Sequence, residues 1–564
     1  MFFLLIKMTQ LVAHGRCVCN AAMSYEDTIR ALNGLQSNAQ YLLKNLNNHS
    51  SGSTSLRYMK KYLIRSGLTL QDVDKLSIIH VAGTKGKGST CAFTEKILRD
   101  YGFRTGFYSS PHLVQVTERI RINGQPIKES LFSKYFWQVY NVLNSQKEDD
   151  SDMPTYFKFI TVVMFHIFLN ADIDVVILEV GIGGEYDCTN VISNPVCEGI
   201  TSLGLDHTGL LGNTLEEIAR QKSGIFKPNS IAFTVPQPEN AMRVLRQTAI
   251  ERNCRLYVVP AFKSYDWKGN PPVLGMAVHA QETNASLAIQ LAHTWILERS
   301  KKTSNGSNDE AINISHNKNP DSVYITNRNI LNLNTENHII DGNPESLNHA
   351  FATNPNEVQG IQKFDNYSKN GQSVEYKIPI VSLTRTANAL SSCKWPGRTQ
   401  VLCGRTMDFY LDGAHTTESI EICTMWYLSE QKNKTGNRFL IFNTTGNRDV
   451  SELLKPLKRL QFKKVYFVPN IAENSPKLDQ LELNTTRHQQ QSACSMNCEL
   501  WGKGNAVVLK NVQQALTDIA QVSDIKFCSQ TEEHKPQVLV TGSLHLVGAA
   551  LALLDPHLAM KTNY

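Results

Sequence analysis

Two parts of the 564-residue chain alternate short apolar runs with helix-length amphipathic segments. In the first part, from Ile78 to Val259, the apolar runs are rich in β-branched residues. We expect strands at Ile78–Ala82, Thr105–Tyr108, Val175–Val180, Glu198–Leu203 and Ile231–Val235. Strands of a parallel sheet are buried on both faces and are joined by crossover helices. The pattern therefore predicts a doubly wound α/β domain with a parallel sheet.

The same alternation returns near the end of the chain. It predicts strands at Phe409–Asp412, Phe439–Asn443, Val465–Val468 and Val538–Thr541, with helices from Thr417, near Leu453 and in the last apolar stretch. This indicates a second, smaller doubly wound α/β domain. It has no glycine-rich phosphate loop, so we expect any nucleotide to be held mainly by the first domain, in the cleft between the two.

Residues 301–378 interrupt these two patterns. They are rich in Asn, Ser, Lys and Asp, with few aromatic residues and no sustained apolar period. Such a segment buries too little apolar surface to fold, so we interpret it as a linker or insertion that is disordered. The predicted domains are then 23–300 and 379–564, with 1–22 as a candidate leader.

Residues 1–22 include Lys7, His14 and Arg16 and no acidic residue, whereas Glu26 and Asp27 follow soon after Met23. This composition is typical of a mitochondrial leader with an internal start at Met23. An N-terminal tail without a targeting role fits the same residues. The leader hypothesis predicts both mitochondrial and cytoplasmic forms, starting at Met1 and Met23.

Composition excludes several classes of protein. The apolar share of 41% and charged share of 19% are ordinary for a globular chain, and no apolar run reaches the roughly 20 residues of a membrane span. The net charge of +6 comes without the dense Lys/Arg tracts of nucleic-acid binders. The twelve cysteines are scattered, and Cys494 and Cys498 near His488 lack the second ligand pair of a zinc site.

A glycine-rich loop follows the first predicted strand. The segment HVAGTKGKGST contains Gly83, Thr84, Lys85, Gly86, Lys87, Gly88 and Ser89, and a helix is expected to start near Ser89. Glycines let backbone N–H groups face phosphate oxygens, and the helix N-terminus adds positive potential. Lys87 can neutralise the terminal phosphates. The strict spacing G-x-x-x-x-G-K-[ST] is absent, and a simple connecting turn is the alternative interpretation.

Oxygen and nitrogen ligands end three of the predicted strands. Glu179 lies at the end of one, Ser110 follows another, and His207 comes just after a third. Ligands of parallel sheets bind at the carboxyl edge, and Mg²⁺ prefers hard oxygen ligands. Taken singly, Ser110 could cap a turn before Pro111, Glu179 could pair with a lysine, and His207 could be a hydrogen-bonded loop residue.

The ordered set of motifs resembles the folylpolyglutamate synthases, within the wider group of Mur-type ligases. The motifs are HVAGTKGKGST, SSPHLVQV, TERIRINGQPI, LEVGIGGEYDCTN, SLGLDHTGLLGNTLEEIA, QKSGIFKP, WPGRTQVL, LDGAHTTES and FNTTGNRD. The resemblance runs from about Met23 to the last helix, apart from the Asn-rich segment. It implies an ATP-dependent ligase that activates a carboxylate as an acyl phosphate and traps it with the amine of L-glutamate.

The resemblance also implies roles for particular residues. Lys87 and Arg398 would stabilise the transferring phosphoryl group, and Asp412 and His415 would contact the nucleotide from the second domain. Two Mg²⁺ ions are implied, with Ser110, Glu179 and His207 as ligands, and a monovalent cation is compatible. Lys222 resembles the lysine that related ligases carry as a carbamate. Ser223 stands beside it, where many relatives have glycine or alanine.

By the same resemblance the substrates are reduced folates, L-glutamate and ATP. The product would be a γ-linked polyglutamate that retains folate in the cell for one-carbon metabolism. The segment SSPHLVQVTERIRING and residues Thr155–Thr161 would lie beside the pterin, and the region around Ser543 beside glutamate. Most relatives are monomers, so a monomer is expected. The alternatives are a dihydrofolate synthase with the same chemistry and a nucleotide-binding switch without ligase activity.

Overall fold

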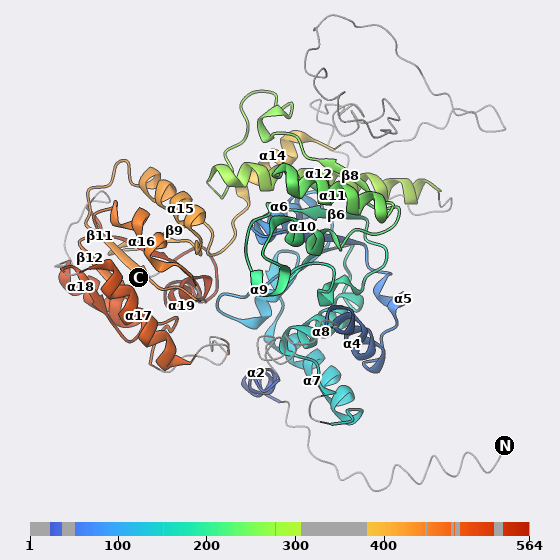
Figure 1. Cartoon of the computed structure of the whole chain (residues 1–564), viewed down its shortest axis with the longest axis horizontal. Helices are drawn as coiled ribbons and strands as arrows, with labels where there is room; N and C mark the ends of the chain where they lie inside the picture. Colours follow the sequence, from blue (N-terminus) through green and yellow to red (C-terminus); the bar gives the residue numbers. More distant parts are fainter. Residues whose placement is uncertain are drawn as a thin grey trace, which may run out of the picture.

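The computed structural model describes residues 23–35, 51–149, 152–276, 278–305, 381–445, 448–474, 479, 486–502, 504–523, 534–562 and 564. They form two α/β units that lie side by side, each built around its own sheet (Figure 1). The candidate leader and residues 306–378 of the predicted insertion lie outside the described residues.

The first unit contains an eight-stranded sheet of order β4-β3-β2-β5-β1-β6-β7-β8. Its strands are β1 Ile78–Ala82, β2 Thr105–Tyr108, β3 Ile120–Ile122, β4 Gln125–Pro126, β5 Val175–Glu179, β6 Cys197–Ile200, β7 Ile231–Thr234 and β8 Arg255–Val258. β1 pairs in parallel with both β5 and β6, and all of its residues are buried. The five predicted strands are present within a few residues. The antiparallel β3–β4 edge and β8 were not predicted.

Helices surround this sheet. They are α2 Tyr25–Asn33, α4 Ser51–Arg65, α5 Leu70–Val73, α6 Lys87–Asp100, α7 Glu129–Ser145, α8 Tyr156–Leu169, α9 Thr208–Leu211, α10 Leu215–Ser223, α11 Glu239–Glu251, α12 His279–Asn305 and α14 Leu383–Ser392. Short 3₁₀ turns lie at η1 Val116–Arg119, η3 Cys188–Val191 and η4 Phe262–Ser264. α10 begins at Leu215, where Thr214 and Glu217 form a reciprocal capping box.

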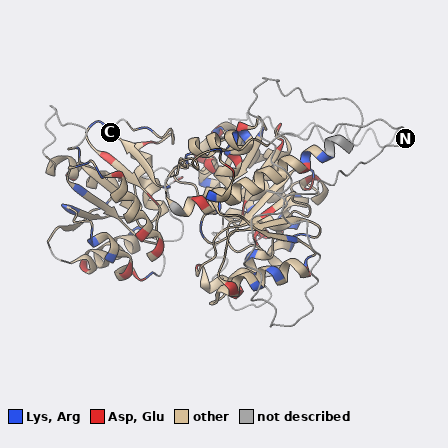
Figure 2. Ribbon diagram, turned by 90° about the horizontal axis from the view of Figure 1, so that it is seen from above, with Lys and Arg blue, Asp and Glu red and all other residues tan. Residues whose placement is uncertain are grey.

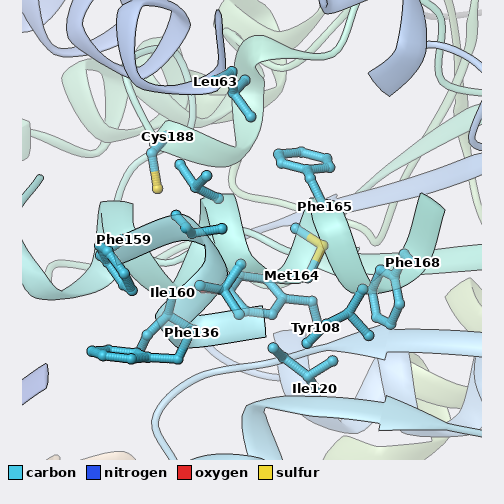
Figure 3. Packing of buried hydrophobic residues seen from close by; sticks show 14 of the residues in the cluster. Leu63, Tyr108, Ile120, Phe136, Phe159, Ile160, Met164, Phe165, Phe168 and Cys188 are labelled. Atoms are coloured by element: carbon cyan, nitrogen blue, oxygen red, sulfur yellow. The ribbon is translucent and has the colours of Figure 1, made fainter. Parts of the chain in front are cut away.

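One hydrophobic core of the first unit lies between α8 and its neighbours (Figure 3). Phe159, Ile160, Met164 and Phe165 of α8 are fully buried against the sheet and the helices around it. A helix that is apolar all round must be enclosed on every side. This packing holds fixed the strand ends that carry the candidate site.

The second unit has a six-stranded sheet of order β13-β12-β11-β14-β10-β9. Its elements are β9 Gln400–Cys403, β10 Asp408–Leu411, α15 Thr417–Glu430, β11 Arg438–Phe442, α16 Val450–Lys458, β12 Lys464–Phe467, α17 Arg487–Trp501, β13 Ala506–Val508, α18 Val512–Val522, β14 Gln537–Thr541 and α19 Leu544–Leu554. All neighbouring pairs are parallel except β9 with β10. The fold is thus the predicted pair of α/β domains.

The chain passes between the units after α14. Ala389, Leu390 and Cys393 are buried in the core of the first unit, so α14 packs there although its residues fall in the predicted 379–564 segment. At the other end of the insertion, α12 continues to Asn305. The second sheet begins only at β9, and Trp395 to Thr399 form the connection.

Acidic and basic residues are interspersed along the chain in both units (Figure 2). Among the described residues, no helix has both the length and the apolarity needed to cross a membrane. Cys494 and Cys498 both lie on α17, the first of them buried.

Candidate active site

A cavity of about 1120 Å³ lies between the two units. Its walls include Thr84, Lys85, Gly86, Lys87, Gly88, Ser89, Ser110, Glu179 and His207 from the first unit, and Arg398, Asp412 and His415 from the second. Gly83 and Lys222 are not among the lining residues and lie directly behind them, joined by a hydrogen bond. The structure thus brings the predicted site residues to one place.

The glycine loop joins β1 to α6. Gly83 and Gly86 have φ of 147° and 88°, in the region that favours glycine. A Cβ on Gly86 would lie 2.2 Å from Oδ1 of Asn284, so space also requires glycine there. α6 begins at Lys87, two positions before the predicted Ser89, and Gly86 supplies no side-chain cap. The first N–H groups of α6 therefore remain available to an anion at the cavity wall.

Two lysine side chains meet behind this loop. Nζ of Lys87 donates to the carbonyl oxygen of Gly83 at 3.1 Å, and Nζ of Lys222 donates to the same oxygen at 2.8 Å. Burial, and then the charge of Lys87, lowers the pKa of Lys222 to about 7. A substantial fraction of Lys222 is therefore a neutral amine near neutral pH.

A third lysine links the units. Nζ of Lys85 lies 3.0 Å from Nε2 of His415 and 3.4 Å from Oδ2 of Asp206. Nδ1 of His415 donates to the Gly413 carbonyl at 2.7 Å, which leaves Nε2 as the acceptor from Lys85. Burial, together with the charge of Lys85, lowers the pKa of His415 to about 3, so the ring is neutral. Arg448 donates to the carbonyl oxygen of His415 and extends this polar chain.

Glu179 ends β5 with its carboxylate buried at the cavity wall. Oε2 accepts a hydrogen bond from the Ser110 backbone N–H at 3.0 Å. Burial raises the pKa of Glu179, whereas the charge of Lys87 opposes that rise. A buried carboxylate with one hydrogen-bond donor suits a hard cation, which would also favour its ionised form.

His207 lines the same cavity and is the N-cap residue of α9, with φ of 51°. Its backbone N–H donates to Asp206 Oδ1 at 3.0 Å. Within the described residues, no three His, Cys, Asp or Glu side chains lie close enough together to form a metal site. The donors therefore fit Mg²⁺, which completes its shell with phosphate oxygens and water, better than a metal held by protein ligands alone.

Asp412 shapes the second unit's wall of the cavity. Oδ2 accepts from the Thr399 N–H at 2.8 Å and Oδ1 from the Ala414 N–H at 2.9 Å. Burial raises the pKa of Asp412, and the charge of Arg398 opposes the rise. Each oxygen keeps a lone pair for a ribose hydroxyl, so an aspartate that holds this turn can also bind a ligand.

Sequence reasoning missed two amide side chains of α12. Gln281 and Asn284 both line the cavity. Nε2 of Gln281 donates to Oγ of Ser89 at 3.3 Å, and Nδ2 of Asn284 donates to Oε1 of Gln281 at 2.9 Å. Their spacing of i and i+3 at the start of an apolar helix puts them on one face, which was the available signal.

Comparison with known proteins defines the family. The family model described as "Dihydrofolate synthetase, C-terminal domain" matches residues 398–553. The mitochondrial folylpolyglutamate synthases of Cricetulus griseus and Homo sapiens are each 38% identical to the chain, over 95% of it and 93% of theirs. The folylpolyglutamate synthase of Candida albicans is 33% identical over 95% of this chain and 97% of its own.

Solved structures show the same fold. The apo form of L. casei folylpolyglutamate synthase has a TM-score of 0.61 and 21% identity, covering 94% of this chain and 99% of its own. A bifunctional folylpolyglutamate synthase/dihydrofolate synthase with Mn, AMPPNP and L-glutamate bound has a TM-score of 0.58 and 23% identity, covering 91% of this chain and 97% of its own. On its sequence relatives, the chain belongs to the folylpolyglutamate synthases, a family of ATP-dependent ligases that build polyglutamate on folates.

Proposed function

We propose that this protein adds L-glutamate to reduced folates in γ-linkage, with ATP cleaved to ADP and phosphate through an acyl phosphate. One observation carries the proposal: the inter-unit cavity joins an uncapped helix N-terminus, Lys87 and Glu179 to Arg398 and His415 of the other unit. Phosphate binding needs only the residues of the first unit. A reaction that must bring three substrates together and exclude water needs the residues of both units.

The chain's own groups divide the work. The N–H groups of α6 and the Lys87 ammonium would hold the β- and γ-phosphates, with Gln281 and Asn284 supporting the loop. Arg398 would stabilise charge on the transferring phosphoryl group from the opposite wall. Glu179, with Ser110 and His207 near the phosphates, would hold Mg²⁺, which when bound neutralises phosphate charge.

The reaction then proceeds in two steps. The terminal glutamate carboxylate of the folate attacks the γ-phosphorus, forming the acyl phosphate and releasing ADP. The α-amine of free glutamate attacks the acyl carbon, the amide forms, and phosphate leaves as the amine loses a proton. Lys85 and Arg448 beside His415 offer positive charge for the carboxylates of the incoming glutamate.

One part of the cavity wall suits the aromatic part of a folate. Tyr156 and Phe157 at the start of α8 line it, and the Arg119 guanidinium lies 5.7 Å from the Tyr156 ring centroid. Flat aromatic surface beside a cation favours a planar, polar heterocycle. This wall lies in the segments expected to flank the pterin.

Lys222 is proposed to carry a carbamate. Its buried position and pKa of about 7 supply the neutral amine that attacks CO₂, and loss of one proton leaves the anionic carbamate. The anion would then sit behind the phosphate loop, where Lys87 and Lys85 contribute opposite charge. A monovalent cation stays a prediction, because no described group of residues identifies its site.

The test is product mass. Purified protein is incubated with ATP, Mg²⁺ and L-glutamate, and with either tetrahydrofolate or dihydropteroate. The proposal predicts tetrahydrofolate products that grow by successive glutamates and no product from dihydropteroate. Product from dihydropteroate alone would identify a dihydrofolate synthase. Bound ATP without ligation of either substrate would identify the nucleotide switch.

We also propose mitochondrial and cytoplasmic pools of a monomeric enzyme. The three mammalian relatives, from Cricetulus griseus, Bos taurus and Homo sapiens, are named mitochondrial. Fractionation of cells that express the chain from Met1 or from Met23 tests the first part, and solution mass tests the second.

A further inference from the structure

The connection between the units contains a tight turn with a clear sequence cause. Arg398 N–H donates to the Trp395 carbonyl at 3.2 Å, and Gly397 has φ of 71°. Proline in the second position and glycine with positive φ in the third are the preferences of a type II turn. The sequence WPGR therefore fixes Arg398 rigidly relative to Trp395.

Trp395 belongs to the first unit. Its ring centroid lies 5.2 Å from that of Phe107 on β2, and the Arg121 guanidinium of β3 lies 5.0 Å from it. The indole Nε1 would lie 3.3 Å from a Cβ on Gly88, in the first turn of α6. The ring therefore rests against the phosphate loop's own helix, held by a cation–π and an aromatic contact.

The rest of the turn belongs to the second unit. The Gly413 N–H donates to the Gly397 carbonyl at 3.1 Å, and the Thr399 N–H donates to Asp412. A Cβ on Gly397 would lie 3.2 Å from Val547 of α19 and equally far from Leu113 of the first unit. The four-residue turn is thus attached to both units, with Arg398 at its cavity end.

From this arrangement we propose that Trp395 is a positioning residue, which sets the distance between Arg398 and the phosphate loop. The turn has two attachments, which are the Trp395 ring in the first unit and the hydrogen bonds with Gly413 and Asp412 in the second. Of these, only the Trp395 ring, at the start of the connection, contacts the first turn of α6. If the ring is lost, the turn stays joined to the second unit and Arg398 moves with it. The inference rests on the proposed phosphoryl transfer, in which Arg398 acts.

Two substitutions separate positioning from space filling. W395L keeps apolar bulk and removes the aromatic face that Arg121 uses, whereas W395F keeps that face. We expect W395L to lower kcat/KM for ATP about 100-fold, the cost of misplacing a reactive group by about 1 Å. W395F should retain most of the activity. W267L is the matched control, because Trp267 packs against Phe262 and Tyr265 away from the cavity.

A double-mutant cycle with R398A decides the point. If Trp395 acts through Arg398, W395L costs little once R398A is present, so the two losses are strongly non-additive. Additive losses, or W395L activity equal to W395F, would overturn the proposal. Thermal unfolding is followed for every variant as the control for folding. If W395L does not fold, W395F replaces it in the cycle, and its smaller loss of kcat/KM must again vanish when R398A is present. Wild-type ligation is measured first, so a failure of the proposed function shows there and not in the cycle.

Discussion

At the residue scale, two buried glutamates of one sheet differ in their surroundings. Glu179 ends β5 beside the positive charge of Lys87, whereas Glu198 lies in β6, where burial raises its pKa to about 8. Glu198 is therefore mainly protonated at neutral pH, and it is not among the residues that line the cavity. The two residues form a natural pair for testing which carboxylate the reaction needs.

We predict that E179Q lowers kcat by about 100-fold or more, because several kcal/mol of charge stabilisation are lost with the cation ligand. The Ser110 N–H can still donate to the glutamine oxygen, so the fold should be retained. E198Q is the control and should change kcat little, since it replaces a mostly neutral acid with a neutral amide. Steady-state rates over a Mg²⁺ titration measure both. Equal losses in the two variants would contradict the assignment of Glu179.

Lys222 predicts a pH dependence of stability. Its pKa falls from 10.5 to about 7 on folding, so between these values the unfolded state binds more protons than the folded state. The free energy of unfolding should therefore rise with pH across this window as far as Lys222 contributes, and its destabilising effect should be fully present below about pH 7.

K222M removes the titrating amine and should flatten that part of the curve. The measurement is denaturant unfolding of the wild type and K222M in CO₂-free buffer, where Lys222 is the free amine, at pH values spanning the window. Removal of dissolved CO₂ supplies a separate readout, because it should lower ligase activity in the wild type alone. An identical pH dependence in both proteins would show that Lys222 does not titrate as its burial implies.

Much of the site was visible at this scale, for a physical reason. Glycine loops and strand-end carboxylates leave sequence signals because their chemistry demands particular residues at fixed places. Gln281, Asn284 and Trp395 left little signal, since amides on a helix and an aromatic residue in a linker have many other uses. The structure places all three at the phosphate loop, where Gln281 donates to Ser89, Asn284 approaches Gly86 and Trp395 approaches Gly88.

At the element scale, apolar runs predicted the central strands best. β1, β2 and β5 are buried in full, and their β-branched runs left few alternatives. β4 and β8 were missed because they lie at the two edges of the sheet, where exposed positions break the apolar pattern, and β3 is only three residues long. The helix start at Lys87 was missed by two residues, since a glycine cap gives no side-chain signal.

The phosphate loop offers a matched pair of glycines. Gly86 and Gly102 both have φ of 88°, but a Cβ would clash with Asn284 only at Gly86, and meets nothing within 4 Å at Gly102. G86A and G102A should each lose about 1–2 kcal/mol of stability to backbone strain. Only G86A should also lose ATP affinity, measured by calorimetric titration. Loss of affinity in both variants would mean that strain, and not the loop's contacts, governs binding.

At the scale of the whole molecule, the two units meet through one loop as well as through the linker. Val114 is buried in the core of the second unit, and Leu113 packs against it. A Cβ added to Gly548 of α19 would lie only 2.2 Å from the carbonyl oxygen of Leu113. The backbone N–H groups of residues 113–115 donate to the Glu118 carboxylate, and the next N–H group along the chain donates to Asp479 of the second unit. Such non-local docking leaves no periodic pattern in the sequence.

G548A should therefore disturb the docking of the units while leaving each core intact. We expect kcat to fall about 10-fold or more, because misdocked units separate Arg398 from the phosphate loop. Binding of ATP to the first unit should change less than kcat. Rapid-quench and calorimetric measurements on the same protein test this difference, and a variant with unchanged kcat would show that the close contact is dispensable.

The central claim is that the folate carboxylate is activated as an acyl phosphate in the cleft between the units. It is tested most directly by labelling the terminal carboxylate of the folate substrate with heavy oxygen and analysing the inorganic phosphate released with product. The account predicts that one labelled oxygen per turnover appears in phosphate, because the carboxylate oxygen bridges to the transferred phosphoryl group. Ligated product with unlabelled phosphate would contradict it.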